Sequence, residues 1–79
     1  MTTALLYSRP GCHLCEDMKL AVLPLLQAAK VGLDVVNIDD DAALREQYGV
    51  RIPVLTLDGE VIAEGRLDAD AVRDALRIR

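Results

Sequence analysis

Two cysteines three positions apart are the residues in this sequence best suited to chemistry. They form Cys12-His13-Leu14-Cys15, and the 79-residue chain has no other cysteine. Residues at i and i+3 of a helix have Cβ atoms about 5–6 Å apart on one face. A disulfide joins residues whose Cα atoms are about 4.4–6.8 Å apart, so one helical turn can hold the pair as thiols or as a disulfide. Two cysteines in one Cys-x-x-Cys indicate redox chemistry or metal binding rather than a disulfide scaffold.

The position of Cys12 predicts that it is the reactive thiol. A turn cluster at residues 8–11 precedes it, and the helical pattern begins there. Unpaired N–H groups and the positive end of the helix dipole favour a thiolate at such a position. Arg9 and a protonated His13 add to this effect, whereas the acidic residues after the second cysteine oppose it. We therefore assign Cys12 as the nucleophile and Cys15 as the resolving thiol that displaces the mixed disulfide.

Two other roles for the cysteine pair are less favoured. A purely stabilising disulfide that closes a four-residue loop gains only about 2 kcal/mol in the loop-entropy model. A zinc or cluster site needs about four protein ligands, and the chain offers two cysteines and one histidine, all adjacent. Only a dimer or an added small thiol could complete such a site. We therefore expect no metal.

The remaining pattern predicts an α/β fold. Expected elements are a strand at 4–7, a helix from 12 to about 30, a strand at 33–38, a helix ending at 48, strands at 54–57 and 61–63, and a last helix. A strand–helix–strand unit makes a right-handed parallel pair, and Asp58-Gly59 is a signal for a tight antiparallel hairpin. The order βαβαββα predicts a four-stranded mixed sheet flanked by three helices, with helices on both faces.

Several element ends can also be predicted. Pro24 predicts a kink or a break in the first helix near residues 20–23, because proline removes a hydrogen bond and clashes with the preceding turn. Gly32 is the expected left-handed residue after that helix. The run at residues 39–41 should cap the second helix, and Asp68 should cap the last one.

Composition excludes several classes of partner. The net charge of −4 argues against nucleic acid or an anionic membrane surface, since both need clustered cations. The longest apolar stretch, residues 20–26, is far below the roughly 20 residues of a membrane-spanning helix. Residues 1–5 lack the pattern of a secretory signal. We expect one domain over residues 1–79, cytoplasmic and monomeric.

Two motifs together make the chain resemble the glutaredoxins of the thioredoxin superfamily. They are Arg9-Pro10-Gly11-Cys12-His13-Leu14-Cys15 and Arg51-Ile52-Pro53-Val54. The likeness covers nearly the whole chain, is closest to small glutaredoxin-like proteins without a settled substrate, and implies a thioredoxin-like fold. In that family the proline is cis and lies against the redox pair, and the residue before it offers backbone hydrogen bonds to the substrate. The resemblance therefore implies a cis Pro53. It also implies that the backbone of Ile52 forms hydrogen bonds with the substrate and that His13 and Leu14 lie at the substrate site.

The resemblance also raises glutathione as a co-substrate. Arg9 matches a basic residue that can meet a glutathione carboxylate, and Gly65 and Arg66 lie in a segment similar to the family's Gly-Gly-x-Asp-Asp. The chain departs from the family in lacking an aromatic residue between the cysteines. It also has Glu64 in place of a glycine, and this carboxylate would repel one that Arg66 could receive. The sequence leaves glutathione binding open and requires no other cofactor.

The predicted function is that of a thiol–disulfide oxidoreductase that reduces protein or glutathione mixed disulfides through Cys12 and Cys15. A second interpretation is a glutathione-dependent iron–sulfur carrier, in which Cys12 of two subunits shares a cluster. Cys15 argues against this carrier, because a resolving thiol competes for the bound thiolate. A third is a non-catalytic adaptor with a thioredoxin fold.

Overall fold

The computed structural model describes residues 2–77, and Met1, Ile78 and Arg79 lie outside the described residues. The elements are β1 (Thr3–Ser8), α1 (His13–Ala28), β2 (Gly32–Asn37), the 3-10 turn η1 (Ile38–Asp40), α2 (Ala42–Tyr48), β3 (Val54–Leu57), β4 (Glu60–Glu64) and α3 (Ala69–Arg77). Apart from η1, this is the predicted order. Among the described residues, no helix combines the length and the apolar character needed to cross a bilayer.

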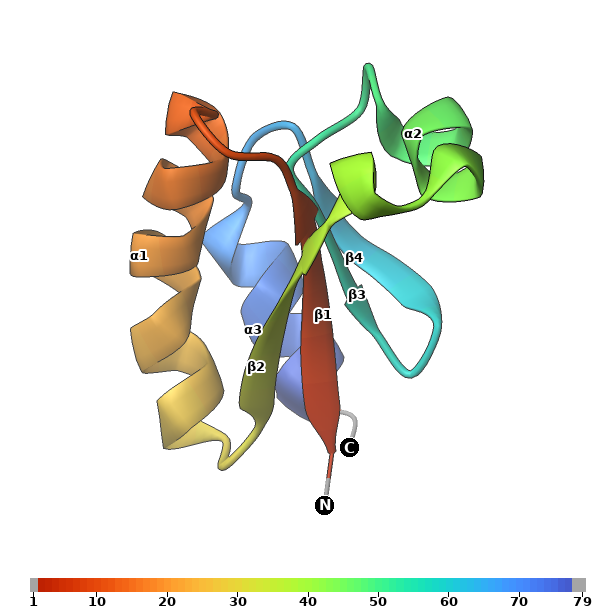
Figure 1. Ribbon diagram of the computed structural model, residues 1–79. Coiled ribbons are helices and arrows are strands. Elements are labelled where there is room, and N and C mark those ends of the chain that lie inside the picture. The colour runs from red at the N-terminus through yellow and green to blue at the C-terminus, as the bar shows by residue number, and fades with distance from the viewer. Residues whose placement is uncertain (1, 78–79) are drawn as a thin grey trace.

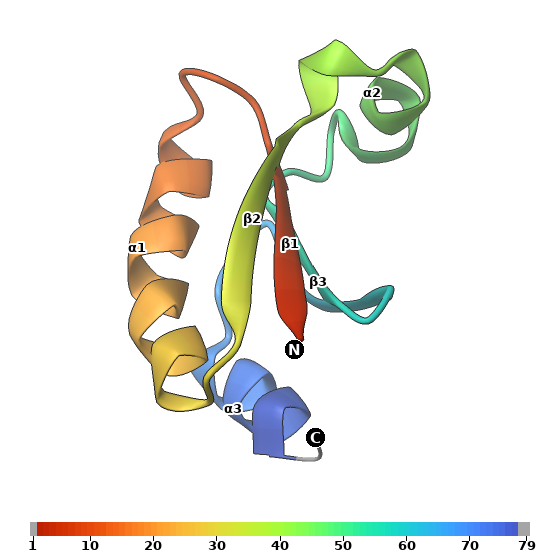
Figure 2. The ribbon, with the colours of Figure 1, turned by 60° about the horizontal axis from the view of Figure 1, so that its bottom comes forward.

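The four strands form one mixed sheet in the order β2-β1-β3-β4. β1 pairs with β2 in parallel and with β3 in antiparallel, and β3 pairs with β4 in antiparallel. Alternate side chains of β1 belong to two core clusters, one on each face of the sheet. Ala4 and Leu6 pack with α1 and α3, while Tyr7 packs towards α2. Figures 1 and 2 show α1 and α3 on one side of the sheet and α2 on the other. The predicted mixed sheet with helices on both faces is confirmed.

Strand register brings four connecting segments to one edge of the sheet. Ser8 at the end of β1 lies beside Asn37 of β2, while Val54 at the start of β3 lies beside Tyr7 of β1 and Glu64 of β4. The chain segments at 9–12, 38–41, 49–53 and 65–68 therefore begin or end at this edge. In Figure 1 they all lie at the top of the molecule.

The first helix runs through its proline. α1 is continuous from His13 to Ala28 with Pro24 inside it, so the predicted break is wrong. Pro24 and Leu20 are both exposed, while the buried face of the helix consists of Cys15, Met18, Val22 and Leu26. The Leu20 carbonyl, which loses its helical N–H donor, lies on the side that water can reach. The cost of the proline therefore does not fall on the packed face.

The left-handed residue after α1 is Lys30, not the predicted Gly32. Lys30 has φ of 60°, while Gly32 is the first residue of β2. The Lys30 N–H donates to the Gln27 carbonyl at 3.0 Å, and the Val31 N–H donates to the Leu26 carbonyl at 2.9 Å. These are the two hydrogen bonds of a Schellman motif, here built with a lysine at the left-handed position.

Of the three acidic residues after β2, Asp39 and Asp40 belong to η1 and Asp41 caps α2. Ile38, Asp39 and Asp40 form η1, so β2 ends one residue earlier than expected. Only Asp41 caps α2, by accepting the N–H groups of Ala43 and Leu44 at 2.8 and 3.3 Å. The buried Ile38 side chain packs in the core cluster on the α2 face, so the first residue of the turn belongs to the core.

Two predicted ends are confirmed. Asp58 and Gly59 both have positive φ, 52° and 83°, and they join β3 to β4 in a two-residue hairpin. Asp68 caps α3, because its carboxylate accepts the Ala71 N–H at 3.2 Å.

The lysine at the left-handed position gives a stability prediction. Lys30→Gly should raise the free energy of unfolding by about 0.5–1 kcal/mol, because glycine avoids the Cβ clash of this conformation but gives the unfolded chain more freedom. Urea denaturation measures the change. Gly32→Ala is the control, since its Cβ would meet Thr3 at no less than 3.4 Å. A loss of stability from Lys30→Gly, or an equal gain from Gly32→Ala, would contradict the assignment of Lys30.

Candidate functional site

A tight turn delivers Cys12 to the start of α1. The Cys12 N–H donates to the Arg9 carbonyl at 3.3 Å. Gly11, the third residue of this turn, has φ of 81°, a conformation that costs glycine little. Pro10 fixes the second position, where its φ suits the turn. The Pro-Gly sequence therefore sets the position of the first cysteine.

Cys12 is the N-cap of α1. Its backbone is extended, and its Sγ accepts the Cys15 N–H at 3.2 Å. The two cysteines form a disulfide with Cα atoms 5.2 Å apart. Cys12 is half-buried, whereas Cys15 is only 3% exposed. A substrate can therefore reach the first sulfur, while the second lies one turn deeper and can reach only the first.

His13 and Leu14, the two residues between the cysteines, both face solvent. Leu14 is 60% exposed. It lies on the wall of a cavity of about 650 Å³ between α1 and the segment after β4, hereafter the groove. The groove is lined by Leu14, Asp17, Met18, Ala21, Glu64, Gly65, Arg66 and Leu67. The structure thus brings three of the predicted site residues, Leu14, Gly65 and Arg66, to one surface.

The Ile52–Pro53 peptide bond is cis, and the Pro53 side chain is fully buried. The Pro53 carbonyl accepts the Gly65 N–H at 2.7 Å, so these two predicted site residues are in direct contact. The Ile52 N–H donates to the Tyr48 carbonyl at 3.0 Å. This bond leaves the Ile52 carbonyl as the backbone group that it can offer to a substrate.

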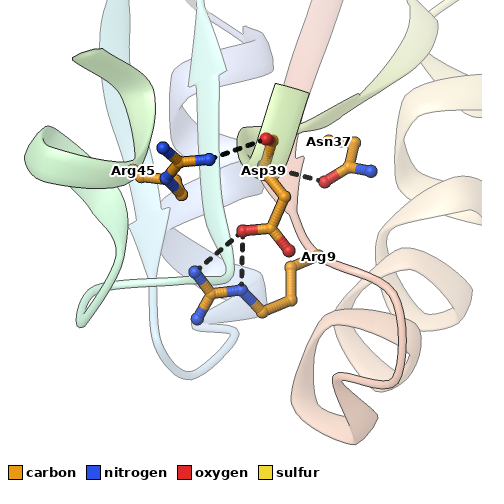
Figure 3. Close-up of polar contacts among 4 residues, drawn as sticks. All are labelled: Arg9, Asn37, Asp39 and Arg45. Carbon is orange, nitrogen blue, oxygen red and sulfur yellow. Dashed lines mark hydrogen bonds and ion pairs between the residues drawn. The ribbon is translucent and has the colours of Figure 1, made fainter. Parts of the chain in front are cut away.

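Arg9 has a partner that the sequence did not reveal. Both its Nε and its Nη2 donate to Asp39 Oδ1, at 3.3 and 3.0 Å (Figure 3). Asp39 belongs to η1, thirty residues further along the chain. Register places Asn37 beside Ser8, so the turn after β2 lies next to the turn after β1. The arginine expected to meet a substrate carboxylate therefore already binds one from the protein.

Glu64 is neutralised by a residue that sequence reasoning missed. Arg51 donates two hydrogen bonds to it, Nε to Oε2 and Nη2 to Oε1, both at 2.8 Å. Hydrogen bonding to Arg51 lowers the pKa of Glu64, and the same bond raises the pKa of Arg51. The Arg51 guanidinium also lies 5.3 Å from the ring centre of Tyr48, which stacks on Tyr7 at 4.4 Å. The predicted repulsion by a free Glu64 charge therefore does not describe this site.

No sequence signal links Arg51 to Glu64, since the two residues belong to different segments thirteen positions apart. Their contact follows from the pairing of Val54 with Glu64 across β3 and β4. Arg66, by contrast, is exposed and has no ion-pair partner within residues 2–77. In this respect Arg66 differs from Arg9 and Arg51, which are both ion-paired.

The Arg51–Glu64 pair predicts a pH effect on stability. The folded-state pKa of Glu64 lies below its ordinary value of 4.5, so the ionised form favours folding above that pH and the contribution is lost as the pH falls through the folded-state pKa. Glu64→Gln should therefore lower the free energy of unfolding at pH 7 and reduce its fall towards about pH 3. Urea denaturation at both pH values tests this, with the exposed Glu60→Gln as a control on the same strand. Equal effects of the two substitutions would contradict the prediction.

Comparison with known proteins agrees with this architecture. Residues 3–77 match the model of the family described as Glutaredoxin-like domain (DUF836). Uncharacterized protein Rv0508 of Mycobacterium tuberculosis is 34% identical over 80 aligned positions, which cover 86% of this chain and 80% of that protein.

Solved structures are also similar. The NMR structure of protein Ne2328 from Nitrosomonas europaea has 32% identity and a TM-score of 0.83, covering 94% of this chain and 89% of that one. The X-ray structure of XcR50 from X. campestris has 38% identity and a TM-score of 0.75, covering 96% and 97%. A mutant thioredoxin from Halobacterium salinarum has 28% identity and a TM-score of 0.67, covering 98% and 73%. The chain therefore belongs to the glutaredoxin-like family and has a thioredoxin-like fold, with its Cys-x-x-Cys pair at the start of the first helix.

Proposed function

We propose that the protein is a thiol–disulfide oxidoreductase that reduces protein or glutathione mixed disulfides, with Cys12 as the nucleophile and Cys15 as the resolving thiol. The observation that carries the proposal is the difference between the environments of the two sulfurs. Cys12 caps the helix, accepts a backbone N–H and is only half-buried, whereas Cys15 is buried. A helix N-terminus stabilises a thiolate, and an accessible thiolate is the species that attacks disulfides.

The reaction has two displacement steps. The Cys12 thiolate attacks one sulfur of the substrate disulfide, a bond forms between these sulfurs, and the other substrate sulfur leaves as a thiolate that takes a proton from water. Cys15 then loses its proton to water and attacks Cys12, which releases the second substrate sulfur. The substrate gains two electrons and the protein becomes the Cys12–Cys15 disulfide, the form seen in the structure. An external dithiol or two thiols restore the reduced protein.

The residues around the pair would orient the substrate. The carbonyl of Ile52, next to the cis peptide bond, would accept a backbone N–H of the substrate, while His13 and Leu14 would contact its side chains. Support comes from the strand register, which brings the segments at 9–12 and 49–53 to the same edge. We place the reaction in the reducing cytoplasm, carried out by a monomer and needing no metal.

Alkylation rate as a function of pH, on Cys12→Ser and Cys15→Ser variants, tests the roles. Cys15→Ser should keep a thiol with a pKa below the ordinary value of about 8.5 and should trap mixed disulfides with substrate. Cys12→Ser should lose the rapid alkylation at low pH. Faster alkylation of Cys15 than of Cys12 would reverse the roles, and absence of turnover with an ordinary Cys12 pKa would favour a non-catalytic adaptor.

A further inference from the structure

Charge at the site decides which disulfides it can accept. Glutathione carries two carboxylates and one ammonium group, so a glutathione mixed disulfide brings net negative charge to the redox pair. Recognition of carboxylates in proteins relies on arginine or lysine donors that are free to pair with them. The relevant observation is therefore how Arg9, Arg51 and Arg66, in the segments that meet at this edge of the sheet, are paired; Arg45 of α2 also donates to this edge, through the Asp39 carbonyl.

Arg9 is bound to the carboxylate of Asp39, and two further hydrogen bonds hold the backbone of Asp39 in place. The Asp39 N–H donates to Asn37 Oδ1 at 2.9 Å, and the Asp39 carbonyl accepts Arg45 Nη1 at 2.9 Å (Figure 3). These contacts fix the backbone of η1 on both sides of the carboxylate that binds Arg9. A substrate carboxylate that took Arg9 would leave Asp39 unpaired beside it, and the two like charges would repel.

Arg51 is likewise bound by a carboxylate of the protein, that of Glu64. Its two hydrogen bonds to Glu64 fill the guanidinium face that would otherwise bind a carboxylate in bidentate fashion. The contact with Tyr48 further restricts the side chain. The charge of Arg51 is therefore already neutralised by Glu64, and a substrate carboxylate at the remaining Nη1–Nη2 face would lie beside the Glu64 carboxylate.

The groove offers apolar surface and little net charge. Leu14 on α1 and Leu67 on the facing segment line it, together with the buried Met18 and the charged residues Asp17 and Arg66. Asp17 and Arg66 have opposite charges, and neither has an ion-pair partner within residues 2–77. Since Arg51 neutralises Glu64, the lining carries no excess of positive charge that would attract an anionic tripeptide.

We propose that this site prefers disulfides whose flanking groups are uncharged or cationic, as in a peptide segment of another protein, over the anionic glutathione mixed disulfide. Asp39 is the main specificity-determining residue, because it removes Arg9 from the substrate. The proposal rests on the proposed oxidoreductase function and names its substrate class. A substrate side chain next to the cysteine would lie against Leu14 in the groove.

Two matched disulfides test the preference. One is the disulfide of glutathione, and the other is the disulfide of glutathione with both carboxylates amidated, so that size and backbone are the same and only charge differs. kcat/KM is measured for each with dithiothreitol as the reductant. The native protein should turn over the amidated disulfide faster than the acidic one.

Asp39→Asn and Asp40→Asn are the matched variants. Both remove one negative charge from η1, but Asp40 is exposed and makes none of the ion pairs found among residues 2–77. Asp39→Asn should raise kcat/KM for the acidic disulfide relative to the amidated one by about two- to five-fold, the range of one exposed ion pair. It should also lower the pKa of Cys12 measured by alkylation, because the freed Arg9 charge lies three residues before that sulfur. Asp40→Asn should change neither, and adding Arg9→Gln to Asp39→Asn should remove the gain.

The outcomes separate this proposal from the function on which it depends. Faster turnover of the acidic disulfide by the native protein, or equal shifts in Asp39→Asn and Asp40→Asn, would overturn the charge preference while the oxidoreductase function stands. No turnover of either disulfide would overturn the oxidoreductase function, and this proposal with it.

Discussion

The hydrogen bond from the Cys15 N–H to the Cys12 sulfur is the contact on which the site depends. A helix start leaves backbone N–H groups without partners, and here a sulfur atom takes the place that an oxygen usually has. One contact thus caps α1 and holds the Cys12 sulfur where the helix dipole would favour its thiolate in the reduced protein. The Pro-Gly turn before Cys12 and the buried face of α1 both serve to keep that sulfur at the first turn.

Strand pairing then decides what surrounds the sulfur. The ends of β1, β2 and β4 and the start of β3 share one edge of the sheet, so four connecting segments meet there. Two ion pairs, Arg9–Asp39 and Arg51–Glu64, tie these segments together. Exposed ion pairs contribute little to stability on average, so their larger effect here is on charge. Each one neutralises an arginine that would otherwise be available to an anionic substrate.

The errors at the element ends have a common origin. Pro24 predicts a break because the local cost of a helical proline is large, yet its solvent-facing side and the packing of Val22 and Leu26 keep α1 continuous. Lys30 adopts the left-handed conformation that a glycine would take more easily, while Gly32 pairs with Thr3 as the first residue of β2. In each case burial and pairing of distant segments outweighed a local preference.

The sequence by itself determined the order of the elements, the mixed sheet, the hairpin at Asp58-Gly59 and the placement of Cys12 at a helix start, because these follow from hydrophobic periodicity and local turn chemistry. The tertiary structure alone decided the partners of Arg9 and Arg51 and the groove beside Leu14. Those contacts join segments thirteen and thirty residues apart. The residue type gives the charge of a side chain, but whether that charge is neutralised depends on which strands lie side by side.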